Sequence, residues 1–137
     1  MWWIYALLSA LFAALTAIFA KIGIKDVNTD LATAIRTVVI LFIAWGIVFV
    51  RGGITTINTL TKINWAFLCL SGIATGLSWI FYFKALQLGK VSQVAPVDKL
   101  SVALAIILSM VFLKEVLTLK VAVGAILIIT GTIILIF

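Results

Sequence analysis

Residues 79–101 read WIFYFKALQLGKVSQVAPVDKLS and connect the end of one long apolar segment to the start of the next. Three charged side chains of this stretch, Lys84, Asp98 and Lys99, stand at positions where a bilayer would hold them. An ionisable side chain inside a bilayer costs about 2.5 to 3.5 kcal/mol on insertion scales, so such residues are functional candidates by default. Whether that default applies depends on the rest of the chain.

The composition of the 137-residue chain is typical of an integral membrane protein. Its hydrophobic fraction is 66% and only 10% of its residues are charged, whereas soluble domains are nearer half apolar. The ten Lys and Arg are scattered singly, so we expect anchoring at the membrane surface and no nucleic-acid partner. There is no His, and Cys69 stands alone, so we expect no metal site, no cofactor, no catalytic residue and no enzyme activity.

Five apolar segments are long enough to cross a bilayer as helices, because a span needs about 20 residues rising about 1.5 Å each. None has the alternating pattern of a barrel strand. We therefore predict an all-α integral membrane fold, with one domain over residues 1–137, located as a multi-pass protein in the cell (plasma or inner) membrane. The predicted spans are 2–20, 31–50, 65–88, 93–113 and 119–137.

The loop charges indicate no single orientation. We call the side that holds the N-terminus side A and the opposite side B. The basic loop residues are Lys21, Lys25 and Lys90 on side B, and Arg51, Lys62, Lys114 and Lys120 on side A. Three against four is nearly balanced under the positive-inside rule, so the chain is predicted to insert in both orientations.

Counting from the span ends places four charged residues at a similar depth in the half of the bilayer nearest side B. We call them the charged set and predict that they bind substrate or a coupling ion. The charged set consists of Arg36, Lys84, Asp98 and Lys99.

The role of Asp98 depends on where its helix begins. If Pro96 is the first helical residue, Asp98 lies in the first turn and complements the helix dipole. If the helix begins near Ser92, Asp98 lies deeper and needs a partner, for which Arg36 and Lys84 are the candidates.

Aromatic and small residues form two further groups. The first group is predicted to line a cavity, with core packing or bonding within the same helix as the alternative; it comprises Trp79, Tyr82, Ser101 and Ser109. The second group is predicted to support close helix packing or a dimer contact; it comprises Gly72, Gly76, Gly124 and Gly131.

The C-terminal half of the chain resembles the EamA repeat of the drug/metabolite transporter superfamily. The family pattern is an AL..G..S.VAP segment, a span, a short LGE-type turn and a last helix that bears glycines. The turn departs from this pattern, because Lys114 stands where the family usually has Gly. The matching residues are Ala85, Leu86, Gly89, Ser92, Val94, Ala95, Pro96, Leu113, Glu115, Gly124 and Gly131.

The resemblance implies a transporter of small organic solutes or metabolites. Typical members carry two five-helix repeats in inverted orientation, and this chain looks like a single repeat. Two copies inserted in opposite orientations would reproduce the inverted pair. We therefore predict an antiparallel, dual-topology homodimer that works by alternating access. Because the charged set is net positive, an anionic or zwitterionic substrate is expected over a cation.

Two other functions stay open from the sequence. One is a dual-topology channel, in which charges at the mouths select an ion. The other is an accessory or structural membrane subunit of a hetero-oligomer, in which the charged set forms an assembly salt bridge.

Overall fold

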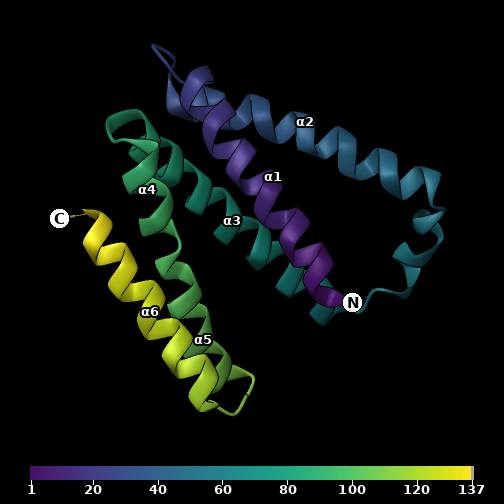
Figure 1. Cartoon of the computed structure of the whole chain (residues 1–137). Coiled ribbons are helices and arrows are strands. Elements are labelled where there is room, and N and C mark those ends of the chain that lie inside the picture. Colours follow the sequence, from purple (N-terminus) through teal and green to yellow (C-terminus); the bar gives the residue numbers. More distant parts are fainter. Residues whose placement is uncertain (137) are drawn as a thin grey trace. The chain divides into compact units, whose positions relative to one another are not determined.

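The computed structural model describes residues 1–136, which form six α-helices and one short 3-10 helix (Figure 1). Phe137, the last residue of the predicted fifth span, lies outside the described residues. The helices are α1 (Trp2–Gly23), α2 (Thr29–Val50), η1 (Gly53–Thr59), α3 (Lys62–Leu88), α4 (Val91–Asp98), α5 (Leu100–Phe112) and α6 (Leu119–Ile136).

Five stretches of helix are long and apolar enough to cross a membrane: α1, α2, α3, α4 together with α5, and α6. This confirms the predicted all-α membrane fold with five spans. Few apolar side chains are buried within the chain, and Phe83 and Leu86 are the largest that are fully buried in its described part. A sparse core is expected for helices in lipid, where the hydrophobic effect does not drive them together.

The chain divides into two compact units. We call Phe19–Gln87 the α2–α3 unit, since it contains both of these helices. We call Met1–Ile18 with Leu88–Phe137 the α5–α6 unit, which also contains α4. Each unit is described by itself below.

Side-chain hydrogen bonds in the α2–α3 unit hold the last turns of α3 against the end of α1 and the turn that precedes α2. The Gln87 amide donates to the carbonyls of Val27 (2.9 Å) and Ile24 (3.3 Å). The Lys21 ammonium donates to the carbonyl of Leu86. These bonds place the end of α3 and the start of α2 at the same level.

The start of α2 is fixed by a side-chain cap. Asn28 Oδ1 accepts hydrogen bonds from the backbone N–H groups of Asp30 (2.8 Å) and Leu31 (3.1 Å). Asn is among the preferred N-cap residues because its oxygen satisfies amides that lack a partner in the first turn. The cap explains why the helix begins at Thr29.

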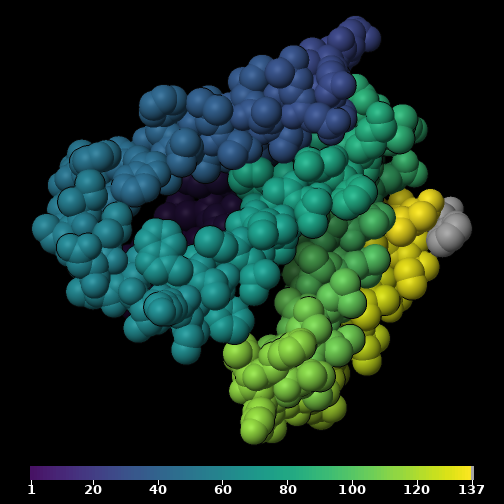
Figure 2. Space-filling model, turned by 180° about the vertical axis from the view of Figure 1, so that it is seen from behind, coloured from purple at the N-terminus to yellow at the C-terminus, as the bar shows by residue number. Residues whose placement is uncertain are grey.

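In the α5–α6 unit, α6 packs along α4 and α5, and Figure 2 shows the same packing from behind, with α6 in yellow. The fourth span consists of two helices with a break at Lys99, where the sequence had suggested one. Pro96 has no N–H, so the carbonyl of Ser92 loses its helical donor. The following bonds tighten to three-residue spacing, from Lys99 N to Pro96 O and from Val102 N to Lys99 O (both 3.0 Å).

The start of α4 decides between the two sequence interpretations of Asp98. Because α4 begins at Val91 and Pro96 lies inside it, Asp98 is the last residue of α4 and not part of a first turn. The N-cap is Lys90, which makes no side-chain capping bond, and Ser92 lies inside the helix. Asp98 therefore does not act at the N-terminus of α4.

Lys114, the second residue after the end of α5, adopts a left-handed backbone conformation with φ of 55°. This is the position at which the family pattern has Gly, the residue that adopts this conformation without strain. A residue with a Cβ pays about 1 to 2 kcal/mol there.

We therefore expect Lys114→Gly to raise the free energy of unfolding by about 0.5 to 1 kcal/mol, after the greater flexibility of Gly in the unfolded chain is subtracted. Thermal unfolding of the purified protein in detergent would measure this change. Lys114→Ala is the matched control, because it removes the charge and keeps the Cβ, and it should give no such gain. A lower melting temperature for Lys114→Gly than for Lys114→Ala would contradict the explanation.

Candidate functional site

The α2–α3 unit stacks a cationic side chain on two aromatic rings. The guanidinium carbon Cζ of Arg36, on α2, lies 4.3 Å from the ring centroid of Trp79 and 4.5 Å from that of Phe83, both on α3. Trp79 and Phe83 are four residues apart and so share one face of their helix. Both distances fall within the range of favourable cation–π contact. We call these three residues the arginine–aromatic group.

The Arg36 guanidinium is not neutralised within its unit. Its Nε atom is buried and has no hydrogen-bond acceptor in residues 19–87. The carboxylates of this unit, Asp26 and Asp30, form no ion pair with Arg36. A buried donor without an acceptor costs more than one bonded to water or protein, and more still when it is charged. The Nε donor of Arg36 is therefore unsatisfied within the α2–α3 unit.

Two other predicted site residues lie next to this group on α3. The half-buried Tyr82 ring packs at 47° to that of Phe83, with 6.0 Å between the centroids. Lys84 is exposed, and as the direct neighbour of Phe83 it projects from a different side of α3. Of the predicted site residues in this unit, Trp79 thus contacts Arg36, and Lys84 does not share its face.

Asp98 and Lys99 lie together at the break between α4 and α5. Lys99 Nζ lies 3.3 Å from Asp98 Oδ2, and the two side chains are 56% and 35% exposed, respectively. An ion pair so exposed within its chain contributes little to stability in water. The charge of Asp98 thus stays accessible at a point where the helix is interrupted.

The two predicted cavity serines in α5 differ in their surroundings. Ser109 donates to the carbonyl of Ile106 (2.9 Å) and is half-buried, whereas Ser101 is exposed in the first turn of α5. The Ser109 hydroxyl is therefore bonded within its own helix, which is the alternative to cavity lining for this residue.

The four glycines proposed for packing have open faces. A methyl group built on any of them would meet no atom within 4 Å in its own unit. The glycines are Gly72 and Gly76 on α3, and Gly124 and Gly131 on α6. Their faces are free to receive another helix, and the dimer contact stays a prediction.

Sequence reasoning missed two polar residues that fix the position of the charged elements. Gln87 bonds the end of α3 to the carbonyls of Ile24 and Val27. It lies four residues after Phe83 on the same face of α3, and this spacing could have revealed it. Thr132 is buried on α6, and its hydroxyl lies within hydrogen-bond distance of the carbonyls of Pro96 (3.2 Å) and Ile128 (2.8 Å). It holds α6 against the end of α4, close to Asp98.

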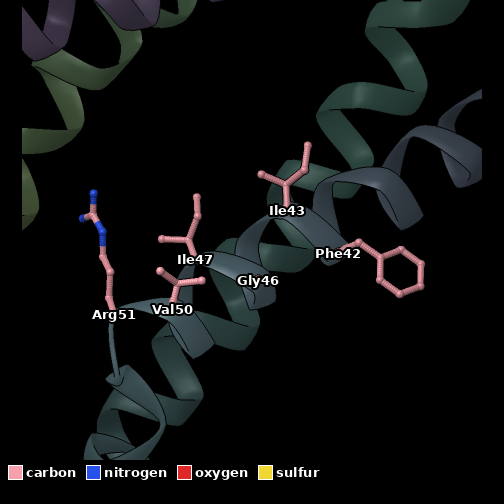
Figure 3. Close-up of a pocket in the computed structure, with 6 residues that line it drawn as sticks. All are labelled: Phe42, Ile43, Gly46, Ile47, Val50 and Arg51. Carbon is pink, nitrogen blue, oxygen red and sulfur yellow. The ribbon is translucent and has the colours of Figure 1, made fainter.

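A hollow lies on the C-terminal half of α2, at the opposite end of the helix from its N-terminal cap (Figure 3). It exists because Gly46 leaves a bare patch, beside which Ile43, Ile47 and Arg51 project to one side while Phe42 points away. The hollow is open and is lined only by residues of α2 and by Arg51, which follows α2. We assign it no ligand.

The five apolar helices define a multi-pass helical membrane protein. Charged side chains lie inside two of its spans, Arg36 in α2 and Lys84 in α3, and Asp98 and Lys99 lie at the break in a third. A model of the EamA-like transporter family matches residues 1–137, and the chain belongs to this family. An uncharacterized transporter in the cobO 3' region of a Sinorhizobium species is 48% identical over 134 residues, which are 98% of this chain and 95% of that protein. No solved structure is significantly similar to the chain.

Membership of this family confirms the resemblance seen in the sequence. The chain is a membrane transporter and a multi-pass protein of the cell membrane. The family and the relative point to a transporter and away from an enzyme.

Proposed function

We propose that the protein moves small organic solutes across the membrane by alternating access, as an antiparallel homodimer of two oppositely inserted copies. The observation that carries this proposal is the length of the relative. This chain covers 95% of a protein named as an uncharacterized transporter, so that relative also has about the length of a single five-helix repeat.

The distribution of charge supports a second, inverted copy. In the topology expected from five spans, the charged set lies in the half of the bilayer nearest side B, and the other half has no equivalent. A two-fold axis in the membrane plane places one charged set toward each face, flanking a central cavity. Inverted repeats of this kind are the usual basis of alternating access.

The helix faces and loop charges agree with this arrangement. The glycine faces of α3 and α6 are open within their units and permit a close approach by a second copy. The loop charges are nearly balanced between the two sides, so neither orientation is strongly preferred.

Counterflow in sealed vesicles tests transport by alternating access. Vesicles that contain the purified protein and are loaded with an unlabelled solute should accumulate the same labelled solute transiently, and the initial rate should saturate with concentration. A channel would give a rate that does not saturate and no counterflow, and an accessory subunit would give no flux. Either result would reject the proposal.

A further inference from the structure

We propose that Arg36, Trp79 and Phe83 form a binding site for the carboxylate group of a small organic acid. This inference rests on the transport function proposed above and names the substrate class of the protein. It assigns a specific role to Arg36, whose guanidinium lies over two aromatic rings and whose Nε atom has no hydrogen-bond acceptor in residues 19–87.

The guanidinium keeps one donor that a ligand could satisfy. Its Cζ atom lies over the rings of Trp79 and Phe83, at 4.3 and 4.5 Å from their centroids. The Nε atom is buried without an acceptor in residues 19–87. Nε and a terminal nitrogen of Arg form a fork that matches the two oxygens of a carboxylate. A bound carboxylate would satisfy the orphan donor and neutralise the charge in one step.

The depth of Arg36 argues against a lipid phosphate as the natural acceptor. The Gln87–Val27 hydrogen bond sets the end of α3 level with the start of α2. Arg36 lies about 10 Å after the start of α2, and Trp79 and Phe83 lie about 12 and 6 Å before Gln87 along α3. A long cationic side chain near a helix end normally extends toward the headgroups. Arg36 instead lies over two rings that bracket the depth of its own backbone.

The surroundings of Arg36 favour an organic acid over a cation. No carboxylate of the unit pairs with Arg36, so the site offers no acidic partner for an ammonium group. Trp79 and Phe83 supply apolar surface against which the carbon skeleton of an acid can pack. The predicted ligand has one carboxylate end and one apolar end.

Thermal unfolding of the full chain in detergent tests the site with matched pairs of probes. The probes are benzoate, butyrate, lactate and succinate, each compared with its neutral amide, and inorganic phosphate. We expect at least one carboxylate to raise the melting temperature by about 8 °C at a concentration of about 100 times its Kd, and its amide to have no effect.

Three variants link the stabilisation to Arg36. Arg36→Gln should abolish the carboxylate shift, and Arg36→Lys should weaken binding about tenfold or more, because Lys keeps the charge and loses the planar fork. Arg51→Gln, directly after the same helix and outside the site, should keep the full shift. Gel filtration would show that each variant is folded. If Arg36→Gln does not fold, Trp79→Leu provides the second test and should also reduce the shift.

Several outcomes would overturn the assignment. They are a shift by the amide equal to that of the acid, an undiminished shift in Arg36→Gln, a shift with phosphate alone, and no shift with any carboxylate. Carboxylate binding without counterflow would retain the binding site and reject only the transport function.

Discussion

Variants fixed in opposite orientations should each be inactive alone and should recover transport when they are expressed together. The nearly balanced loop charges make this experiment feasible, because few substitutions are needed to tip them. Lys25→Gln with Lys90→Gln leaves side B with Lys21 alone, against four basic loop residues on side A. This variant should insert with side A in the cytoplasm.

The opposite variant removes charge from side A. Its substitutions are Arg51→Gln, Lys62→Gln and Lys120→Gln, and they leave Lys114 as the basic loop residue on side A against three on side B. It should insert with side B in the cytoplasm. Neither variant changes a residue of the charged set or of the arginine–aromatic group.

An antiparallel dimer needs both orientations, so each variant alone should show uptake at the background level, and their combination should approach the wild type. The measurement is uptake into cells that express one or both variants, with membrane levels checked by immunoblot. A variant whose C-terminus is found on one side of the membrane only, and which takes up solute at the wild-type rate, would show that a single orientation is sufficient.

Neutralising Asp98 should have the second largest effect. Asp98 is an acid at the end of α4 and stays partly exposed beside Lys99, at the break caused by Pro96. Asp98 is the one acid of the charged set, so it is the candidate for coupling transport to a proton gradient. We expect Asp98→Asn to lower uptake driven by a proton gradient by at least about tenfold, a difference of about 1.4 kcal/mol.

The melting temperature and two further variants distinguish a transport role of Asp98 from a structural role. The Asp98–Lys99 pair is partly exposed, so its loss should leave the melting temperature almost unchanged. Asp98→Glu should recover part of the activity, and Asp26→Asn, which neutralises an acid in the turn before α2, should behave as the wild type. A large drop in melting temperature that accounts for the lost uptake would identify Asp98 as a structural residue.

The sequence predicts the five spans well because a span is defined by length and hydrophobicity, and both are local properties. It also marks the arginine–aromatic group in part. Arg36 is conspicuous as a charge inside a span, and Trp79 is a predicted cavity residue. Their contact could not be derived, because it depends on the rotation of α2 and α3 about their axes, which no local sequence pattern sets.

The break at Lys99 shows a second limit. A proline inside a helix can kink it, end it or mark its first turn, so Pro96 alone does not determine the outcome. In the structure α4 begins five residues earlier at Val91, and Thr132 from α6 bonds the Pro96 carbonyl. This contact joins residues far apart in sequence, and no local pattern predicts it.

Labelling the C-terminus from each side of the membrane tests the central claim most directly. In a Cys69→Ser background, a cysteine added after residue 137 would be exposed to a membrane-impermeant maleimide from one face of sealed vesicles and then from the other. The dual-topology homodimer predicts about equal labelling from the two faces. Labelling from one face only would contradict it.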